Sequence, residues 1–188
     1  QKFTETIYLF IDTAGDGISV TNHQGNATFG DTTITNTGAD GILIANNAAG
    51  SNLAFNSANI NNTVRGLAVS NNAGALAING GSIGATTSTT AEAVLIDGGN
   101  GTLNIATDIV NTTANSVAIS NRTGGTVTLS GNINDTGLGI NASNNTGGSV
   151  NFSGSDKTLN TGVNDAVTLA NNTGATVNFT NGGLDVDT

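Results

Sequence analysis

Residues 41–60 read GILIANNAAGSNLAFNSANI, a stretch whose pattern returns throughout the chain. Apolar and polar side chains alternate in it, with the pair Ile42 and Ile44 followed by the pair Leu53 and Phe55. Alternation with a period of two predicts strands that bury one face. Each such strand is only about three to five residues long, and strands this short are stable only when many of them pair together.

Seven copies of this pattern follow one another, with 23 to 27 residues between the first members of successive copies. The first apolar pairs are Ile18/Val20, Ile42/Ile44, Leu67/Val69, Val94/Ile96, Val117/Ile119, Ile140/Ala142 and Val167/Leu169. The second pairs are Ala27/Phe29, Leu53/Phe55, Leu76/Ile78, Leu103/Ile105, Val127/Leu129, Val150/Phe152 and Val177/Phe179. A third segment holds one main apolar residue, namely Ile34, Ile60, Ile83, Ile109, Ile133, Leu159 or Leu184. A period near 25 residues with three short strands predicts an all-β parallel β-helix (β-solenoid) of about seven coils.

Each first strand is expected to end at a polar corner, because an Asn falls two residues past its apolar pair in most copies. These residues are Asn22, Asn46, Asn71, Asn121, Asn144 and Asn171, and Gly98 takes the position in the remaining copy. Stacked Asn side chains can hydrogen-bond along the rod, and Asn tolerates the left-handed backbone of a tight corner. The residues directly after this corner are expected to be solvated; they include His23, Asn47, Asn72, Arg122, Asn145 and Asn172.

The composition excludes several classes of protein. Asn, Thr and Gly account for 30, 30 and 27 of 188 residues, and Pro, Cys, Met and Trp are absent. Without Cys there is no disulfide framework and no thiol chemistry. The formal net charge of −9 argues against a nucleic-acid partner, and no apolar run approaches the roughly 20 residues of a membrane-spanning helix. The absence of Pro suits strands that must all donate ladder hydrogen bonds.

We expect residues 1–188 to form a single β-solenoid domain and interpret the chain as a fragment of a longer repeat array. Residues 1–13 are interpreted as part of a preceding coil, because residues 10–13 align with residues 34–37. An uncapped solenoid exposes edge strands at both ends. The expected partners are therefore neighbouring coils of a longer chain, or further copies bound end to end.

Three segments, residues 16–20, 171–179 and 182–188, resemble large bacterial secreted proteins built from β-strand repeats. Autotransporter passengers and filamentous-haemagglutinin-type adhesins are the best-known proteins of this style, and the resemblance covers essentially the whole chain. It implies that the parallel β-helix is right-handed. It also implies export through an outer membrane and a role at the bacterial cell surface or outside the cell.

Asp16 and Asp40 are the main candidates for chemistry, because each lies two residues before an inward Ile in neighbouring copies. Stacking would place their backbones about 4.8 Å apart, which suits the carboxylate pair of a retaining glycosidase or a weak extracellular Ca²⁺ site. The alternative is that both residues only cap turns. Arg65 and Glu92 occupy the same position in the next copies, which predicts a negative–positive–negative ladder that needs no metal.

Apart from the pair of Asp16 and Asp40, few features of the sequence indicate catalysis. Trp is absent, the longest excursion is residues 85–91, and His23 has no evident nucleophile and carboxylate for a triad. We therefore expect no catalytic or cofactor-binding residue and predict a non-enzymatic extracellular scaffold, a segment of a bacterial adhesin stalk or a fibre. The alternative is a β-helix that binds or cleaves a polysaccharide, with a host or surface glycan as partner. A third reading, an ice-binding solenoid, lacks an outward file of Thr residues on any strand.

Overall fold

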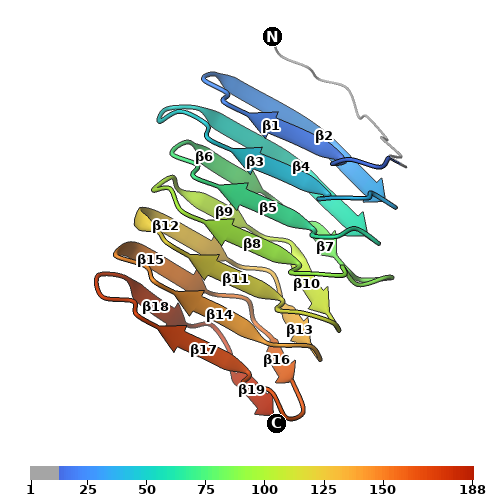
Figure 1. Ribbon diagram of the computed structural model, residues 1–188, viewed down its shortest axis with the longest axis vertical. Helices are drawn as coiled ribbons and strands as arrows, with labels where there is room; N and C mark the ends of the chain where they lie inside the picture. The colour runs from blue at the N-terminus through green and yellow to red at the C-terminus, as the bar shows by residue number, and fades with distance from the viewer. Residues whose placement is uncertain (1–12) are drawn as a thin grey trace.

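The computed structural model describes residues 13–188, which are wound into a parallel β-solenoid of about seven coils (Figure 1). The first strand of each coil joins a seven-stranded sheet made of β1 (Ile18–Thr21), β3 (Ile42–Ala45), β5 (Leu67–Ser70), β8 (Val94–Asp97), β11 (Val117–Ser120), β14 (Ile140–Ser143) and β17 (Val167–Ala170). Among residues 13–188 there is no helix, and so none that is long and apolar enough to cross a membrane.

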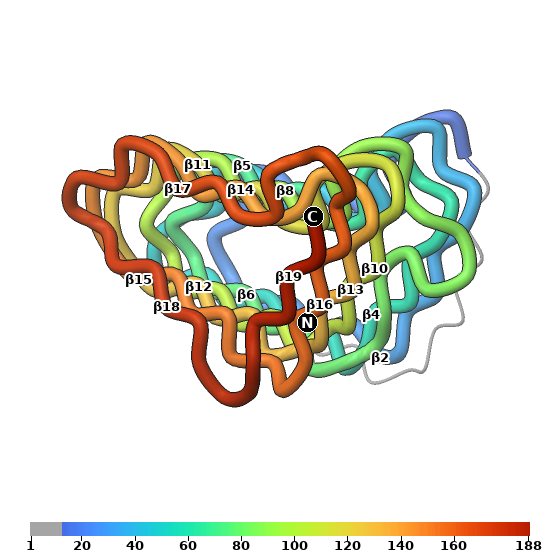
Figure 2. Tube along the Cα trace, turned by 90° about the horizontal axis from the view of Figure 1, so that it is seen from below, coloured from blue at the N-terminus to red at the C-terminus, as the bar shows by residue number. Residues whose placement is uncertain are grey.

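The second and third strands of the coils form a twelve-stranded sheet. Its members are β2 (Asn26–Thr35), β4 (Asn52–Asn61), β6 (Ala75–Ile78), β7 (Gly81–Ile83), β9 (Leu103–Ile105), β10 (Asp108–Asn111), β12 (Thr123–Leu129), β13 (Ile133–Asp135), β15 (Gly147–Phe152), β16 (Lys157–Asn160), β18 (Thr176–Phe179) and β19 (Leu184–Asp187). Viewed along the stack, the first sheet lies on one side of the interior and β6, β12, β15 and β18 lie on the other (Figure 2).

The register of the first sheet confirms the predicted repeat. Ile18 lies opposite Ile42 in β1 and β3, and Ile140 lies opposite Val167 in β14 and β17. Each inward residue therefore stacks on the equivalent residue of the next coil, and Ile42 is fully buried. Burying an aliphatic side chain of this size contributes about 1.5–3 kcal/mol, so the apolar files supply the main driving force for stacking.

One file of the second strands changes from aromatic to aliphatic and back. Phe29 stacks on Phe55 with ring centroids 4.4 Å apart, and Phe152 stacks on Phe179 with centroids 4.7 Å apart. Ile78, Ile105 and Leu129 fill the coils between these two pairs. Rings stacked face to face in register fit the spacing of paired strands, so the bulkiest side chains add area to the core without disturbing the coil.

The third strands correct one part of the predicted repeat. Lys157, not Leu159, lies opposite Ile133, and Leu159 lies opposite Asp135. Lys157 is fully buried in the file that Ile109 and Ile133 occupy in earlier coils, and its ammonium group donates to the carbonyl oxygens of Gly154 (2.5 Å) and Thr180 (3.1 Å). These carbonyls compensate part of the cost of desolvating the ammonium group, which explains how a Lys fits an apolar file.

The bend between the second and third strands also differs along the stack. In the first two coils both strands are continuous, as β2 and β4 of ten residues each. Two residues separate β6 from β7, and residues 153–156 separate β15 from β16. Of the partial coil expected at residues 1–13, only Thr13 lies within the described residues, and it forms a parallel bridge with Thr37.

Candidate functional site

The six Asn residues expected at the first corner are exposed and share one backbone conformation. Asn22, Asn46, Asn71, Asn121, Asn144 and Asn171 have φ between 47° and 57°, and Gly98 has φ 71° in the same position. Asn and Gly adopt this left-handed region at the lowest cost. Only one side-chain hydrogen bond joins two of the six among the described residues, from Asn171 to Asn144 (3.1 Å). Their common feature is thus the backbone turn.

The residues directly after this corner form a buried polar file, which corrects the expectation that they are solvated. Asn47, Asn72, Arg122 and Asn145 are at most 2% exposed. The oxygen of Asn145 accepts from the backbone N–H of Arg122 (2.9 Å), and its amide nitrogen donates to the carbonyl of Ile119 (3.2 Å). His23 is half-buried, and its backbone N–H donates to the side-chain oxygen of Asn47 (2.7 Å). We call these residues the inner polar file. Their side chains form the hydrogen bonds between coils that the sequence predicts for the Asn residues one position earlier.

Arg122 fills a gap in the inner polar file. In an earlier coil, Asn72 donates its amide to the carbonyl of Gly74 (2.7 Å). One coil further on, Gly99 has no side chain to reach the equivalent carbonyl of Gly101. Arg122 supplies that donor from the next coil at 2.5 Å, and also donates to the carbonyls of Gly98 and Gly124 (both 3.0 Å). Burial lowers the pKa of the Arg122 guanidinium below its ordinary value.

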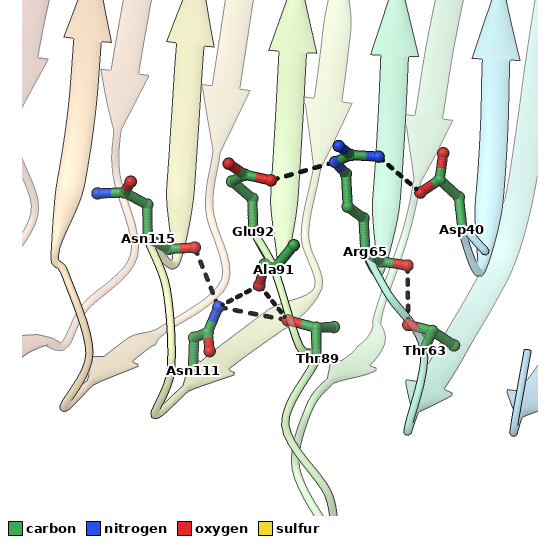
Figure 3. Close-up of polar contacts among 8 residues, drawn as sticks. All are labelled: Asp40, Thr63, Arg65, Thr89, Ala91, Glu92, Asn111 and Asn115. Carbon is green, nitrogen blue, oxygen red and sulfur yellow. Dashed lines mark hydrogen bonds and ion pairs between the residues drawn. The ribbon is translucent and has the colours of Figure 1, made fainter. Parts of the chain in front are cut away.

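The predicted ion ladder is confirmed at the start of the first sheet (Figure 3). Arg65 donates to the Asp40 carboxylate at 3.2 Å and to Glu92 at 3.1 Å, so it bridges the coils on both sides. Burial, and to a smaller extent the neighbouring carboxylates of Asp16 and Glu92, raise the pKa of the Asp40 carboxyl above its ordinary value of 3.8 against the opposing effect of Arg65. The Arg65 side chain remains 35% exposed, so solvent screens the ladder.

A second buried polar file lies at the corner where the third strand leads into the next first strand (Figure 3). Thr63 donates to the carbonyl of Arg65 (2.8 Å), and Thr89 donates to the carbonyl of Ala91 (2.8 Å). In the following coil Asn111 donates to Ala91 (2.9 Å), and one coil later Asp135 accepts from the backbone N–H groups of Ser116 (2.8 Å) and Gly137 (2.6 Å). These side chains satisfy backbone groups that the bend removes from the ladders.

Asp16 and Asp40 lie in neighbouring coils as predicted, but each already has a partner. An Asp16 oxygen accepts the backbone N–H of Asp40 (3.1 Å), and the Asp40 carboxylate pairs with Arg65. Within residues 13–188 no group of three or more His, Cys, Asp or Glu side chains is placed to hold a metal ion. Asp16 therefore bonds the backbone of the next coil and Asp40 forms an ion pair, so a Ca²⁺ ion would have to displace Arg65 from Asp40.

The last described coil leaves part of the apolar interior open. Leu169 is 53% exposed and Val186 is 47% exposed, whereas the equivalent residues Ile119 and Leu159 are fully buried one or two coils earlier. A groove at this end is lined by residues 162–167 together with Leu184, Val186 and Thr188. The exposed edges of β17 and β19 run beside it, so this end presents both unpaired strands and apolar side chains.

The burial of two cationic side chains, Lys157 and Arg122, was not predicted from the sequence. For Lys157 a signal was present: in every other copy the third apolar residue lies four or five residues after the second pair, whereas Leu159 lies seven after it. Arg122 carried a weaker signal, the coincidence of Gly98 and Gly99 one coil earlier. Comparisons of the chain with models of protein families, with curated proteins and with solved structures found no match.

Proposed function

We propose that this chain is a non-enzymatic structural scaffold, a segment of an adhesin stalk or fibre that acts at the bacterial surface or outside the cell. The observation that carries the proposal is the uninterrupted stacking of one strand per coil through a seven-stranded sheet. At the inter-strand spacing of about 4.8 Å this makes a rod of roughly 30 Å. Such a rod suits a spacer, because each coil adds a fixed length.

The exposed face of the last described coil has the residue types of an interface between coils. Leu169 and Val186 have the residue types and positions that are buried between coils elsewhere in the stack. Unpaired edge strands with an apolar face are templates for further pairing. A further coil, from a longer chain or from another copy, would cover these residues and continue both sheets.

End-to-end assembly is tested by imaging the purified chain with negative stain over a range of concentrations. We expect rods that lengthen with concentration, and expect Leu169→Asp to shorten them because it places a charge on the apolar end. The matched control is Thr168→Asp, which adds the same charge on the outward face of the same strand. If both variants form rods as long as the parent, end-to-end assembly through this face is wrong.

The polysaccharide alternative is tested in the same preparations by measuring the release of reducing ends from a panel of glycans. The scaffold proposal expects no release above background. Release that disappears in Asp16→Asn, while the circular dichroism spectrum stays unchanged, would replace the scaffold with an enzyme. Binding of a glycan without cleavage would instead favour the adhesin form of the scaffold.

A further inference from the structure

The described residues contain three Asn-Gly dipeptides, Asn79-Gly80, Asn100-Gly101 and Asn181-Gly182. In such a pair the backbone nitrogen of Gly can attack the side-chain amide carbon of the preceding Asn. Gly favours this step because it has no Cβ to hinder the approach and its backbone is the most adaptable. The three dipeptides are chemically identical, so we attribute any difference between them to the fold.

Asn79 and Gly80 lie in the two-residue break between β6 and β7, and Asn79 is exposed. A Cβ built on Gly80 would meet no atom within 4 Å, so the space around it is open. Asn79 donates its N–H to the carbonyl of Phe55 (3.0 Å), and the carbonyl of Gly80 accepts from Ala58 (3.0 Å). Among the hydrogen bonds of residues 13–188, none uses the N–H of Gly80, so the attacking nitrogen has no bond to break.

The other two dipeptides are held differently. The N–H of Gly101 donates to the carbonyl of Asn72 (3.0 Å), and a Cβ built on Gly101 would clash with the carbonyl oxygen of Gly74. Asn181 has φ 56° and Gly182 has φ 105°. A Cβ built on Gly182 would clash with the carbonyl oxygen of Ser155, so this exposed backbone closely approaches the coil before it. Rotation of the peptide between Asn and Gly, which ring closure requires, meets a close neighbour in these two dipeptides and open space at Gly80.

We propose that Asn79 is a site of spontaneous deamidation in the folded protein, and that it reacts ahead of Asn100 and Asn181. The Gly80 nitrogen bonds to Cγ of Asn79, the bond from Cγ to the side-chain nitrogen breaks, and ammonia leaves with the proton from Gly80. Water then opens the resulting succinimide at either carbonyl and gives aspartate or isoaspartate. One water is consumed, one ammonia is released, and nothing is oxidised or reduced.

The product changes the bend between β6 and β7. Either product adds a negative charge to a chain whose formal net charge is already −9. Isoaspartate also inserts a carbon into the main chain between the N–H that bonds Phe55 and the carbonyl that bonds Ala58. The two anchors then no longer match the register of β4, so we expect the pairing of β4 with β7 to loosen.

To test this, the folded chain is incubated at mildly alkaline pH, and aspartate and isoaspartate are mapped at all three sites by mass spectrometry after digestion. A parallel sample is incubated in denaturant, where the three dipeptides lose their structural environment. We expect conversion at Asn79 to exceed conversion at Asn100 and at Asn181 in the folded sample, and the three sites to convert alike in denaturant. Equal conversion in the folded sample, or faster conversion at Asn100 or Asn181, overturns the proposal.

Gly80→Ala provides the matched variant, because the open space around Gly80 accommodates a methyl group. We expect it to fold normally by circular dichroism, to lose the conversion at Asn79 and to leave conversion at Asn181 unchanged. If Asn79 converts at the parental rate in Gly80→Ala, attack by the Gly80 nitrogen is wrong.

Discussion

Arg65 and Arg122 lie two coils apart and place the same side chain in opposite surroundings. Arg65 lies just before β5, its side chain is 35% exposed, and it bridges the carboxylates of Asp40 and Glu92. Arg122 is 2% exposed in the inner polar file, and its guanidinium donates to the backbone carbonyls of Gly98, Gly101 and Gly124. The contrast shows that exposed charge pairing contributes little to the stability of this solenoid, whereas buried side chains must satisfy the backbone carbonyls at its bends.

The largest effect is expected from Arg122→Ala. It leaves the carbonyls of Gly98, Gly101 and Gly124 without their donor, and each buried acceptor left unpaired costs roughly 1–3 kcal/mol. We expect the free energy of unfolding to fall by at least about 3 kcal/mol, measured by urea denaturation. A loss no larger than that of Arg65→Ala would remove the distinction between the two arginines.

A smaller effect is expected from Asn145→Ala. This variant removes the acceptor of the Arg122 backbone N–H and the donor to the Ile119 carbonyl. We expect a loss of about 1–3 kcal/mol in the free energy of unfolding. The adjacent residue gives a matched control, because Asn144 is exposed with φ 57° and Gly adopts this conformation freely. Asn144→Gly should change stability by less than about 0.5 kcal/mol. A larger loss at Asn144 would make the outer corner the structural ladder after all.

Arg65→Gln should have a small effect, because exposed ion pairs contribute only about 0–1 kcal/mol. The salt dependence of the stability loss distinguishes Arg65→Gln from Arg122→Ala. Raising the salt concentration should reduce the difference between Arg65→Gln and the parent in thermal melts, since screening weakens the parental ion pairs. The loss in Arg122→Ala should not depend on salt, and a salt-dependent loss there would contradict the carbonyl-based account.

The smallest effect concerns pH. The pKa of Asp40 in the folded protein lies above its ordinary value of 3.8, so the folded state binds this proton more tightly than the unfolded state. The contribution of Asp40 to stability is therefore fully present below pH 3.8 and is lost as pH rises through the folded-state pKa. We expect Asp40→Asn to flatten the pH dependence of the melting temperature in this window. A steeper dependence in the variant would show that the direction is wrong.

The first sheet could be predicted almost completely from the sequence. The alternation of Ile42 and Ile44 and the Asn at six of the seven corners fix facing, spacing and register, because the side-chain period of a strand is two. Prediction failed where hydrophobicity and spacing disagreed: Leu159 is apolar, but the coil length places Lys157 in the file of Ile133. Counting residues from the second strand gives the right answer, since each coil must close over the one before it.

Sequence alone determined that the chain is a stack of seven short-stranded coils, since only stacking buries so many regularly spaced apolar residues. Only the tertiary structure decided which polar residues face inward. Asn144 and Asn145 are adjacent and identical, yet one is exposed and the other is fully buried. The left-handed turn at Asn144 reverses the direction in which the next side chain points, and bonds to neighbouring coils then offset the cost of its burial.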